Sequence, residues 1–433
     1  MERSLNVWIN DTCIGTLRES RGLWEFSYSQ AWLTQPSAYP LCPLLPLQTD
    51  PLLDGASRRP VQWFFDNLLP EEGQRQLIAR STGVAIEDAF ALLEHYGAES
   101  AGSLTLLPPT QTPAPGQVQS LTTDELSSRI RNMPTVPLAA TAAKKMSLAG
   151  AQHKMAVILE SGELLEPVGS EPSSHILKPE HSDPAWSHSV INEWFIMTLA
   201  GRLGLPVPKV HRLYVPQPVF LVDRFDRAAN ESNRQRLHCI DACQMTGLAR
   251  EFKYSAGSIE RLAELVELCR TPVVARLQLF QWLVFNVLAG NEDAHLKNLS
   301  FLMSNRQASL APFYDLLCTA VYSTRAFNRD SWPEGATLAW PILGVQHLVD
   351  ISPALLIEAG EHMGIKPTTA RDNIRRMVKA ILPTALQLLE EVMEENQQLS
   401  LTRPELRATL AGEARLLRSI CYTIIRGMTE RLA

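Results

Sequence analysis

The sequence predicts an α+β protein with two parts, a mixed first half and a mainly helical second half. Up to about residue 235, short segments typical of strands, such as the alternation of Trp24, Phe26 and Tyr28 with polar residues, are mixed with a few helical segments. From residue 236 onward, apolar residues recur at spacings of three and four, as on the buried face of amphipathic helices. The length of 433 residues and the apolar fraction of 45% allow two or three domains with a large core.

Composition and charge narrow the classes of function. The net charge of −6 disfavours independent DNA binding, because proteins that neutralise many phosphates are usually basic. Seven scattered cysteines without a C-x-x-C pair give no support for a zinc ribbon or a redox pair, and they fit a reducing cytosol. The N-terminus lacks the apolar core of a signal peptide, and the apolar stretch 277–289 is too short and too polar to span a bilayer. We therefore expect a soluble, cytoplasmic protein.

The first 107 residues are predicted to form a small α+β unit with no evident chemistry of its own. Segment 5–15 indicates two short strands around Asn10 and Asp11, a pair that favours a tight hairpin. A helix broken by Pro70 and a shorter helix ended by Gly97 follow.

Residues 108–145 are predicted to form a linker and a helix, and residues 146–235 a core of strands around one helix. The segment 146–154 precedes the predicted strand at 155–159, and two interpretations of it are open. It is either an ordinary turn with one glycine or a loop whose backbone N–H groups cradle nucleotide phosphates. It contains neither G-x-G-x-x-G nor G-x-x-x-x-G-K-[ST], so the motif evidence is weak.

One residue and one segment of this core also have two interpretations each. Lys178 ends a strand, where a lysine usually faces solvent. In a kinase the same lysine would contact the α- and β-phosphates and pair with a helical glutamate such as Glu193. The segment 219–227 is either a sheet strand with a salt-bridged end or a hinge whose backbone binds adenine.

The second half is predicted to be helical up to the C-terminus. Helices are expected at 239–248, 258–270, 277–289, 371–398 and 415–428. In the first of these, Cys239 and Cys243 are four residues apart and are expected to face one way as small buried side chains.

A dense polar segment follows the helix at 277–289. Asp293 and Asn298 have the D-x-x-x-x-N spacing of a kinase catalytic loop, although the preceding H-R is missing. In such a loop the aspartate accepts the proton of the attacking hydroxyl, and the asparagine holds Mg²⁺. Asp315 supplies a second carboxylate further on. The pattern indicates phosphoryl transfer. The alternative interpretation is a solvated turn after a helix, without catalytic function.

Taken together, these segments resemble the HipA family of bacterial serine/threonine kinases, the toxin halves of HipA–HipB toxin–antitoxin pairs. The resemblance rests on FFDNLLP, FALLEHYGAESAG, SLAGAQHKMAVIL, HILKP, NEWFIMTLAGRLGLPVP, VDRFDR, QWLVFNVLAGNEDAHLKN and LAPFYDLL, which occur in this order. It implies a two-lobed protein-kinase-like fold. Residues 1–107 would be an added N-terminal subdomain, residues 146–235 a mixed α/β N-lobe core, and residues 236–433 an all-helical C-lobe.

The resemblance also implies a role for individual residues. Asp293 would be the catalytic base, Asn298 and Asp315 would bind Mg²⁺, and Ser147 would be the site of inactivating autophosphorylation. The residues implied at ATP are Ala149, Gly150, Ala151, Gln152, His153, Lys154, Lys178, Asp223, Arg224, Phe225, His295, Lys297, Asn298, Tyr314 and Asp315.

The implied partners are a small helix-turn-helix antitoxin, operator DNA reached mainly through that antitoxin, and a translation component such as an aminoacyl-tRNA synthetase as substrate. The sequence departs from the family pattern at three places: His153 stands where an acid is expected, Glu292 replaces a threonine, and the segment between Lys178 and Glu193 is short. Two alternatives stay open: a small-molecule phosphotransferase, and a catalytically inactive, nucleotide-binding corepressor.

Overall fold

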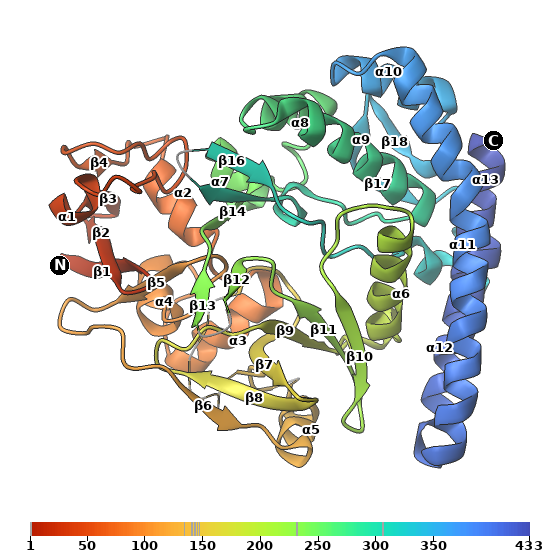
Figure 1. The fold of residues 1–433 in the computed structure, drawn as a ribbon, viewed down its shortest axis with the longest axis horizontal. Helices are drawn as coiled ribbons and strands as arrows, with labels where there is room; N and C mark the ends of the chain where they lie inside the picture. Colours follow the sequence, from red (N-terminus) through yellow and green to blue (C-terminus); the bar gives the residue numbers. More distant parts are fainter. Residues whose placement is uncertain are drawn as a thin grey trace. The chain divides into compact units, whose positions relative to one another are not determined.

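The structure is a computed structural model that describes residues 2–133, 135–139, 142, 144, 146, 148–230, 233–304 and 307–433 (Figure 1). The chain divides into two compact units. Unit 1 comprises Met1–Pro179, Leu221–Lys253 and Ser300–Ala311, and unit 2 comprises Glu180–Phe220, Tyr254–Leu299 and Pro312–Ala433.

Unit 1 begins with a five-stranded antiparallel sheet in the order β4-β3-β2-β1-β5. Its strands are β1 (Arg3–Ile9), β2 (Thr12–Ser20), β3 (Leu23–Tyr28), β4 (Leu52–Leu53) and β5 (Leu104–Leu107). The helices of this part are α1 (Gln30–Leu33), α2 (Pro60–Asp66), α3 (Glu72–Thr82) and α4 (Ala89–Tyr96). The predicted hairpin is confirmed, with Asn10 at its turn at a φ of 50°. The predicted helix break at Pro70 is also confirmed, because it falls between α2 and α3.

A second antiparallel sheet of unit 1 has neighbouring strands in the order β9-β7-β8-β6. These strands are β6 (Gln117–Ser120), β7 (Met155–Glu160), β8 (Glu163–Val168) and β9 (His175–Pro179). The predicted helix of the linker region is α5 (Thr123–Asn132), and the Thr122 side chain caps it by accepting a bond from the backbone N–H of Glu125. Strand β11 (Pro218–Asp223) ends in unit 1, where a hairpin of β12 (Arg227–Asn230) and β13 (Asn233–Arg236) follows.

A third sheet of unit 1 corrects one prediction. Strand β14 (Cys239–Asp241) pairs with β15 (Ser300–Ser304), which pairs with β16 (Gln307–Leu310). The expected helix at 239–248 is therefore wrong in its first three residues, and only α7 (Ala242–Thr246) is helical. The tertiary pairing of Cys239 with Leu302 overrides the local helical pattern. Cys239 and Cys243 consequently lie on different elements, although both are buried.

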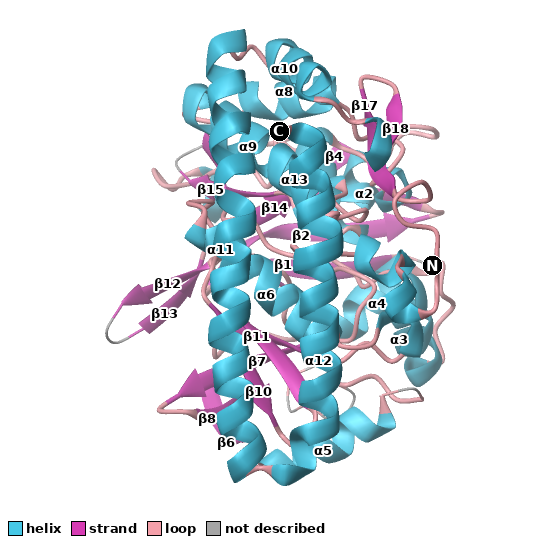
Figure 2. Ribbon diagram, turned by 90° about the vertical axis from the view of Figure 1, so that its right-hand side faces the viewer, coloured by secondary structure: helices cyan, strands magenta, loops and turns pink. Residues whose placement is uncertain are grey.

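Unit 2 is mainly helical (Figure 2). Its helices are α6 (Ser189–Arg202), α8 (Ile259–Glu267), α9 (Pro272–Ala289), α10 (Pro353–His362), α11 (Pro367–Thr402), α12 (Arg407–Ser419) and α13 (Arg426–Leu432), with a π-helical turn at Ile420–Ile425. The long α11 and α12 run side by side at its C-terminal end. Unit 2 also contains β10 (Val210–Tyr214), β17 (Thr337–Ile342) and β18 (Val345–His347). Because β14 to β18 all lie in residues 236–433, that region is not all-helical as expected.

Helix α9 lies in the core of unit 2. Phe280, Trp282, Phe285 and most of its other apolar side chains are buried, so the helix packs on nearly all sides. It is the one described helix that is long and apolar enough to cross a membrane by composition, but its extensive burial is the behaviour of a core helix. The predicted polar segment begins directly at its C-terminal end.

Candidate active site

The candidate catalytic loop begins where α9 ends at Gly290. Gly290 has a left-handed φ of 64°, and its N–H donates back to the Val287 carbonyl. A Cβ at this position would lie 2.6 Å from Ile424 Cγ2 and 3.0 Å from Ala320 Cβ. Glycine is required here both for the backbone conformation and for the close approach of neighbouring side chains.

A relay of asparagine side chains fixes the start of this loop. Asn286, in the last turn of α9, accepts a 2.7 Å hydrogen bond at Oδ1 from the Asn291 amide. Asn291 Oδ1 in turn accepts a 3.0 Å bond from the backbone N–H of Asp293. Asn286 and Asn291 are both buried, so their amides stabilise the loop away from solvent. The result is a rigid backbone beneath Asp293.

The five-residue spacing from Asp293 to Asn298 closes the loop on itself. The Asn298 amide nitrogen donates a 2.9 Å bond to the Asp293 carbonyl, which also accepts a 2.8 Å bond from the backbone N–H of His295. Asn298 ends a short 3-10 turn at Leu296–Asn298. Because the amide nitrogen is committed to this bond, the amide oxygen is the atom that could serve a metal ion.

Asp315 is tethered to the same loop through its neighbour. The Tyr314 hydroxyl donates a 2.8 Å bond to the Lys297 carbonyl, which joins the residues preceding Asp315 and Asn298. Asp315 has a φ of 56°, an unusual left-handed conformation for a carboxylate residue and a common mark of functional sites. A carboxylate and an amide oxygen, supplied by two tethered segments, are hard oxygen donors of the kind that Mg²⁺ prefers. The residues present therefore fit the predicted metal.

Residues that the sequence pattern did not single out hold both flanks of Asp293. Before it, the backbone N–H of Glu292 donates to Thr319 Oγ1 at 2.6 Å, and Glu292 Oε1 accepts a 2.8 Å bond from the backbone N–H of Thr337. After it, the Trp340 indole donates a 3.0 Å bond to the Ala294 carbonyl. Burial raises the pKa of Glu292.

These partners come from 27 or more residues further along the chain, so no local spacing could have indicated them. The departure of Glu292 from the family pattern acquires a local role, because this side chain attaches strand β17 to the catalytic loop.

The predicted phosphate loop lies in unit 1. Gly150 has a φ of 108°, which a residue with a side chain rarely adopts, and its carbonyl accepts a 3.2 Å bond from the backbone N–H of Glu71. Lys154 Nζ donates a 2.6 Å bond to the Ala149 carbonyl, and the Gln152 amide donates to the Pro179 carbonyl at 3.3 Å. His153 is buried, whereas Ala151 is exposed. The Lys154 side chain therefore bonds the backbone at the start of the same loop.

The remaining predicted ATP contacts are divided between the units. Lys178 is buried on β9 in unit 1, whereas Glu193 is buried on α6 in unit 2, so their pairing stays a prediction. His295 and Lys297 are buried in the catalytic loop of unit 2. Ser147 lies outside the described residues.

The predicted hinge, residues 223–225, contains two partly exposed residues on either side of a buried one. Asp223 Oδ1 lies 2.9 Å from His175 Nε2, and Phe225 is partly exposed. Arg224 instead turns its guanidinium into the protein, and its backbone N–H donates to the Ser174 carbonyl. A role of segment 223–225 at the adenine therefore stays a prediction, and the Arg224 side chain has a different, structural function.

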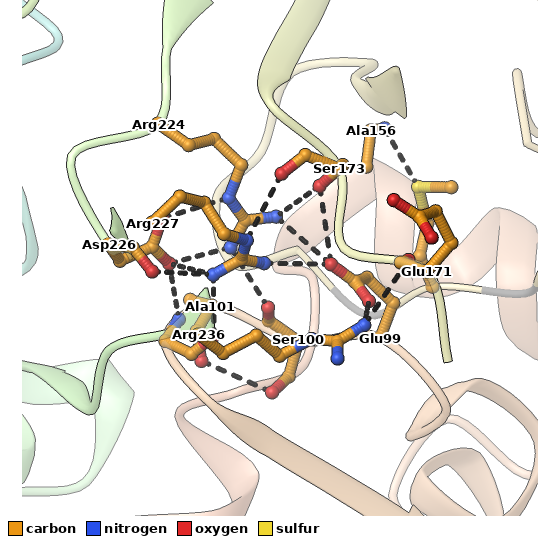
Figure 3. A network of polar contacts seen from close by, with 12 residues as sticks. Glu99, Ser100, Ala101, Ala156, Glu171, Ser173, Arg224, Asp226, Arg227 and Arg236 are labelled. Carbon is orange, nitrogen blue, oxygen red and sulfur yellow. Dashed lines mark hydrogen bonds and ion pairs between the residues drawn. The ribbon is translucent and has the colours of Figure 1, made fainter. Parts of the chain in front are cut away.

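That function is a buried ion cluster centred on Glu99, which we call the Glu99 cluster (Figure 3). The Glu99 carboxylate is fully buried. Its cationic partners are Lys144 Nζ at 2.7 Å, Arg227 Nη2 at 2.8 Å, Arg236 Nη2 at 2.8 Å and Arg224 Nη1 at 3.4 Å. Burial by itself would raise the pKa of Glu99, but these four cations hold it well below its usual range.

Asp226 completes the Glu99 cluster. It lies 2.6 Å from Arg224 Nη2 and accepts a 2.7 Å bond from the backbone N–H of Gly102. Burial by itself would raise the pKa of Asp226. The neighbouring Arg224 and Arg227 have the larger combined effect and lower this pKa to about 2. The cluster therefore joins residues 99–102 to the segment 224–236 through charge pairs that are shielded from water.

Comparison with known proteins identifies the family. Residues 5–107 match the model of the HipA N-terminal domain, and residues 146–385 match the model of the HipA-like C-terminal domain. The second match alone spans more than half of the chain. The chain belongs to the HipA family. The resemblance inferred from the sequence motifs is therefore confirmed.

Sequence similarity to individual proteins supports the assignment of this chain to the HipA family. The Sinorhizobium fredii protein Y4mE, which is named as a kinase, is 36% identical over 334 residues, covering 74% of this chain and 78% of the relative. The serine/threonine-protein kinase toxin HipA of Shewanella oneidensis is 31% identical over 339 residues, covering 74% and 76%.

A solved complex of S. oneidensis HipA, HipB and operator DNA matches with a TM-score of 0.75 and 25% identity, over 98% of this chain and 99% of that one. This match confirms the predicted kinase-like α+β fold. Kinase is the activity class to which the names of these relatives point.

Proposed function

We propose that this HipA-family chain is an ATP-dependent serine/threonine protein kinase. The observation that carries the proposal is the fixed loop around Asp293, whose backbone is held by Asn291 and Asn298 while the residue itself is partly exposed. A carboxylate presented on a rigid backbone suits the orientation and deprotonation of a hydroxyl nucleophile.

In the proposed reaction, the acceptor hydroxyl oxygen attacks the γ-phosphorus of ATP and its proton passes to the Asp293 carboxylate. The bond from the γ-phosphorus to the β–γ bridging oxygen breaks, and ADP leaves. Asn298 and Asp315 would hold Mg²⁺, which would neutralise charge on the phosphates. Lys178, the loop 149–154 and segment 223–225 would bind the nucleotide.

The decisive variant is Asp293→Asn, which keeps the size of the side chain but removes the base. We expect phosphate transfer from labelled ATP to fall by about 10²–10⁴-fold, with ATP–Mg²⁺ binding retained. The measurements are label incorporation into the chain and nucleotide binding by calorimetry. Transfer at the wild-type rate would remove Asp293 from the mechanism.

In the cell, we propose a cytoplasmic toxin that phosphorylates a translation component, such as an aminoacyl-tRNA synthetase, and inactivates itself by autophosphorylation at Ser147. A phosphate at Ser147 would add about −1.5 to −2 charge close to the phosphates of ATP and repel them. Mass spectrometry of the purified chain after incubation with ATP and Mg²⁺ tests both activity and the modified residue.

We also propose a helix-turn-helix antitoxin as partner, with operator DNA reached mainly through it. The complex of a relative with HipB and operator DNA supports this proposal, and so does the net charge of −6. The expected result is co-purification with the antitoxin and a DNA gel shift that needs both proteins. Turnover with small alcohols would favour a small-molecule phosphotransferase instead, and tight nucleotide binding without any transfer would favour an inactive corepressor.

A further inference from the structure

Tyr254 makes a direct contact with the proposed catalytic base. Its hydroxyl donates a 2.5 Å hydrogen bond to Asp293 Oδ1. This length lies at the short end of the range for a hydroxyl bonded to an ionised carboxylate. Tyr254 is 37% exposed, so the bond lies on a face of unit 2 that solvent reaches.

Several contacts hold the tyrosine at this position. Its ring packs edge-on against His295, two residues after Asp293, with centroids 5.0 Å apart and planes at 79°. Three residues after the tyrosine, Gly257 lies so close to Trp340 that a Cβ would be 2.5 Å from the indole ring. Trp340 is the residue that bonds the Ala294 carbonyl. The segment around Tyr254 is thus packed against both the catalytic loop and its support.

The bond from Tyr254 to Asp293 is the kind of contact that a phosphoacceptor hydroxyl must itself make. A phosphoacceptor hydroxyl must come within about 2.6–3.2 Å of the general base to give up its proton. The Tyr254 hydroxyl donates to Asp293 Oδ1 at 2.5 Å, slightly closer than this range, so it already makes the contact that an acceptor would need. A phenol and an acceptor hydroxyl cannot both donate to Oδ1 from one place.

We propose that Tyr254 is a specificity-determining residue that occupies the acceptor position on Asp293 and excludes water from it. The inference rests on the proposed function of Asp293 as the base. A protein acceptor brings binding energy from contacts remote from its hydroxyl and uses part of it to displace the phenol. Water offers only its own hydrogen bonds, so it competes poorly with a tethered, charge-assisted donor.

The excluded reaction is ATP hydrolysis. With water as acceptor, the water oxygen would attack the γ-phosphorus, the bond to the bridging oxygen would break, and one proton would pass to Asp293. The products would be ADP and inorganic phosphate, and the ATP would be lost without modifying a protein. Tyr254 keeps this reaction slow in the absence of an acceptor.

The test compares full-length wild type with Tyr254→Phe, which keeps the ring and removes the hydroxyl. ADP release and phosphate incorporation into protein are measured together with labelled ATP and Mg²⁺, using the chain itself and dephosphorylated casein as acceptors. We expect the ratio of ADP released to phosphate incorporated to rise about five- to tenfold in the variant. Tyr422→Phe, at an exposed tyrosine in the C-terminal π-helical turn, is the matched control and should leave the ratio unchanged.

The outcomes separate the two proposals. A Tyr254→Phe protein that melts normally and binds ATP–Mg²⁺ but keeps the wild-type ratio overturns the inference. Equal loss of hydrolysis and transfer also overturns it, since the tyrosine would then support Asp293 rather than compete at it. Asp293→Asn reports on the underlying mechanism separately: if that variant still transfers phosphate, the proposed function fails whatever Tyr254→Phe does.

Discussion

The Glu99 cluster of unit 1 and the Asp293 loop of unit 2 are both dense in polar groups, yet they treat their carboxylates differently. Glu99 is fully buried, and charged side chains surround its oxygens. Asp293 is partly exposed, and the groups that fix its backbone are amides and main-chain atoms. A buried carboxylate paired in this way can only support structure, whereas the second arrangement leaves a carboxylate accessible to a substrate.

The comparison predicts opposite phenotypes for removing one charge. Glu99→Gln would leave its four buried cationic partners without the carboxylate that they share, and we expect a loss of about 3–5 kcal/mol in the free energy of unfolding. Urea or thermal unfolding of the purified chain measures it. Asp293→Asn, by contrast, should lose activity with little change in stability.

A matched control for Glu99→Gln exists in the same unit. Glu125 pairs with Arg129 across one helical turn and is 40% exposed. Glu125→Gln makes the same chemical change at an exposed carboxylate, and buried Arg129 keeps its pair with Glu166, so the change should cost less than about 1 kcal/mol. Similar losses in both variants would mean that the Glu99 cluster does not stabilise unit 1 in the way described.

Glu180 sharpens the comparison, because it is a partly buried carboxylate that forms no ion pair with the cations in the described part of the chain. Its Oε2 accepts bonds from the Ser189 backbone N–H at 2.8 Å and the Ser189 hydroxyl at 3.1 Å. Burial is the largest influence and, together with the charge of Glu413, raises the pKa of Glu180 to about 7.

The sign of its effect on stability follows directly. Between its ordinary pKa and about 7, the folded chain binds a proton on Glu180 that the unfolded chain has lost. This contribution to stability is therefore present below pH 4.5 and disappears as the pH rises to about 7, with a total of up to about 3 kcal/mol. Glu99, with its pKa held low, contributes in the opposite direction and loses its contribution as the pH falls.

Unfolding midpoints measured from pH 4 to pH 8 test this prediction. Glu180→Gln stays neutral at every pH, so its stability relative to wild type should increase between pH 5 and pH 7.5. A constant difference between the two proteins across this range would show that Glu180 does not titrate in it.

Much of the fold could be predicted from the sequence, because local signals decide it. The Asn10 hairpin, the helix break at Pro70 and the end of α9 at Gly290 each follow from the backbone preferences of one or two residues. The strand at Cys239–Asp241 could not be predicted, because its partner strand begins at Ser300 and tertiary pairing overrides a short helical pattern.

The candidate site shows the same division. The spacing of Asp293 and Asn298 was visible because the bond between them spans one short loop. Tyr254 lies 39 residues before Asp293, and Glu99 lies 125 residues before Arg224, so no sequence spacing relates either pair. The sequence of segment 219–227 allows two interpretations, a hinge that binds adenine and a strand with a salt-bridged end. Arg224 supports the second and leaves the first as a prediction.

Gly290 offers the smallest and most local test of the contrast between the two units. Gly290 and Gly22 both have left-handed backbones, at 64° and 75°, so alanine strains each of them. A Cβ at Gly22 meets nothing within 4 Å, whereas at Gly290 it meets Ile424 and Ala320. Gly290→Ala should therefore destabilise the chain by about 1–2 kcal/mol more than Gly22→Ala, measured by thermal unfolding.

The activity of the same two variants completes the argument. The clash at Gly290 displaces the residues that begin the catalytic loop, so Gly290→Ala should reduce phosphate transfer at temperatures where it remains folded. Gly22→Ala strains a turn in unit 1 and should transfer phosphate at the wild-type rate. If both variants kept full activity, the placement of Asp293 would not depend on the end of α9. The asparagine relay from Asn286 through Asn291 would then suffice to position the base.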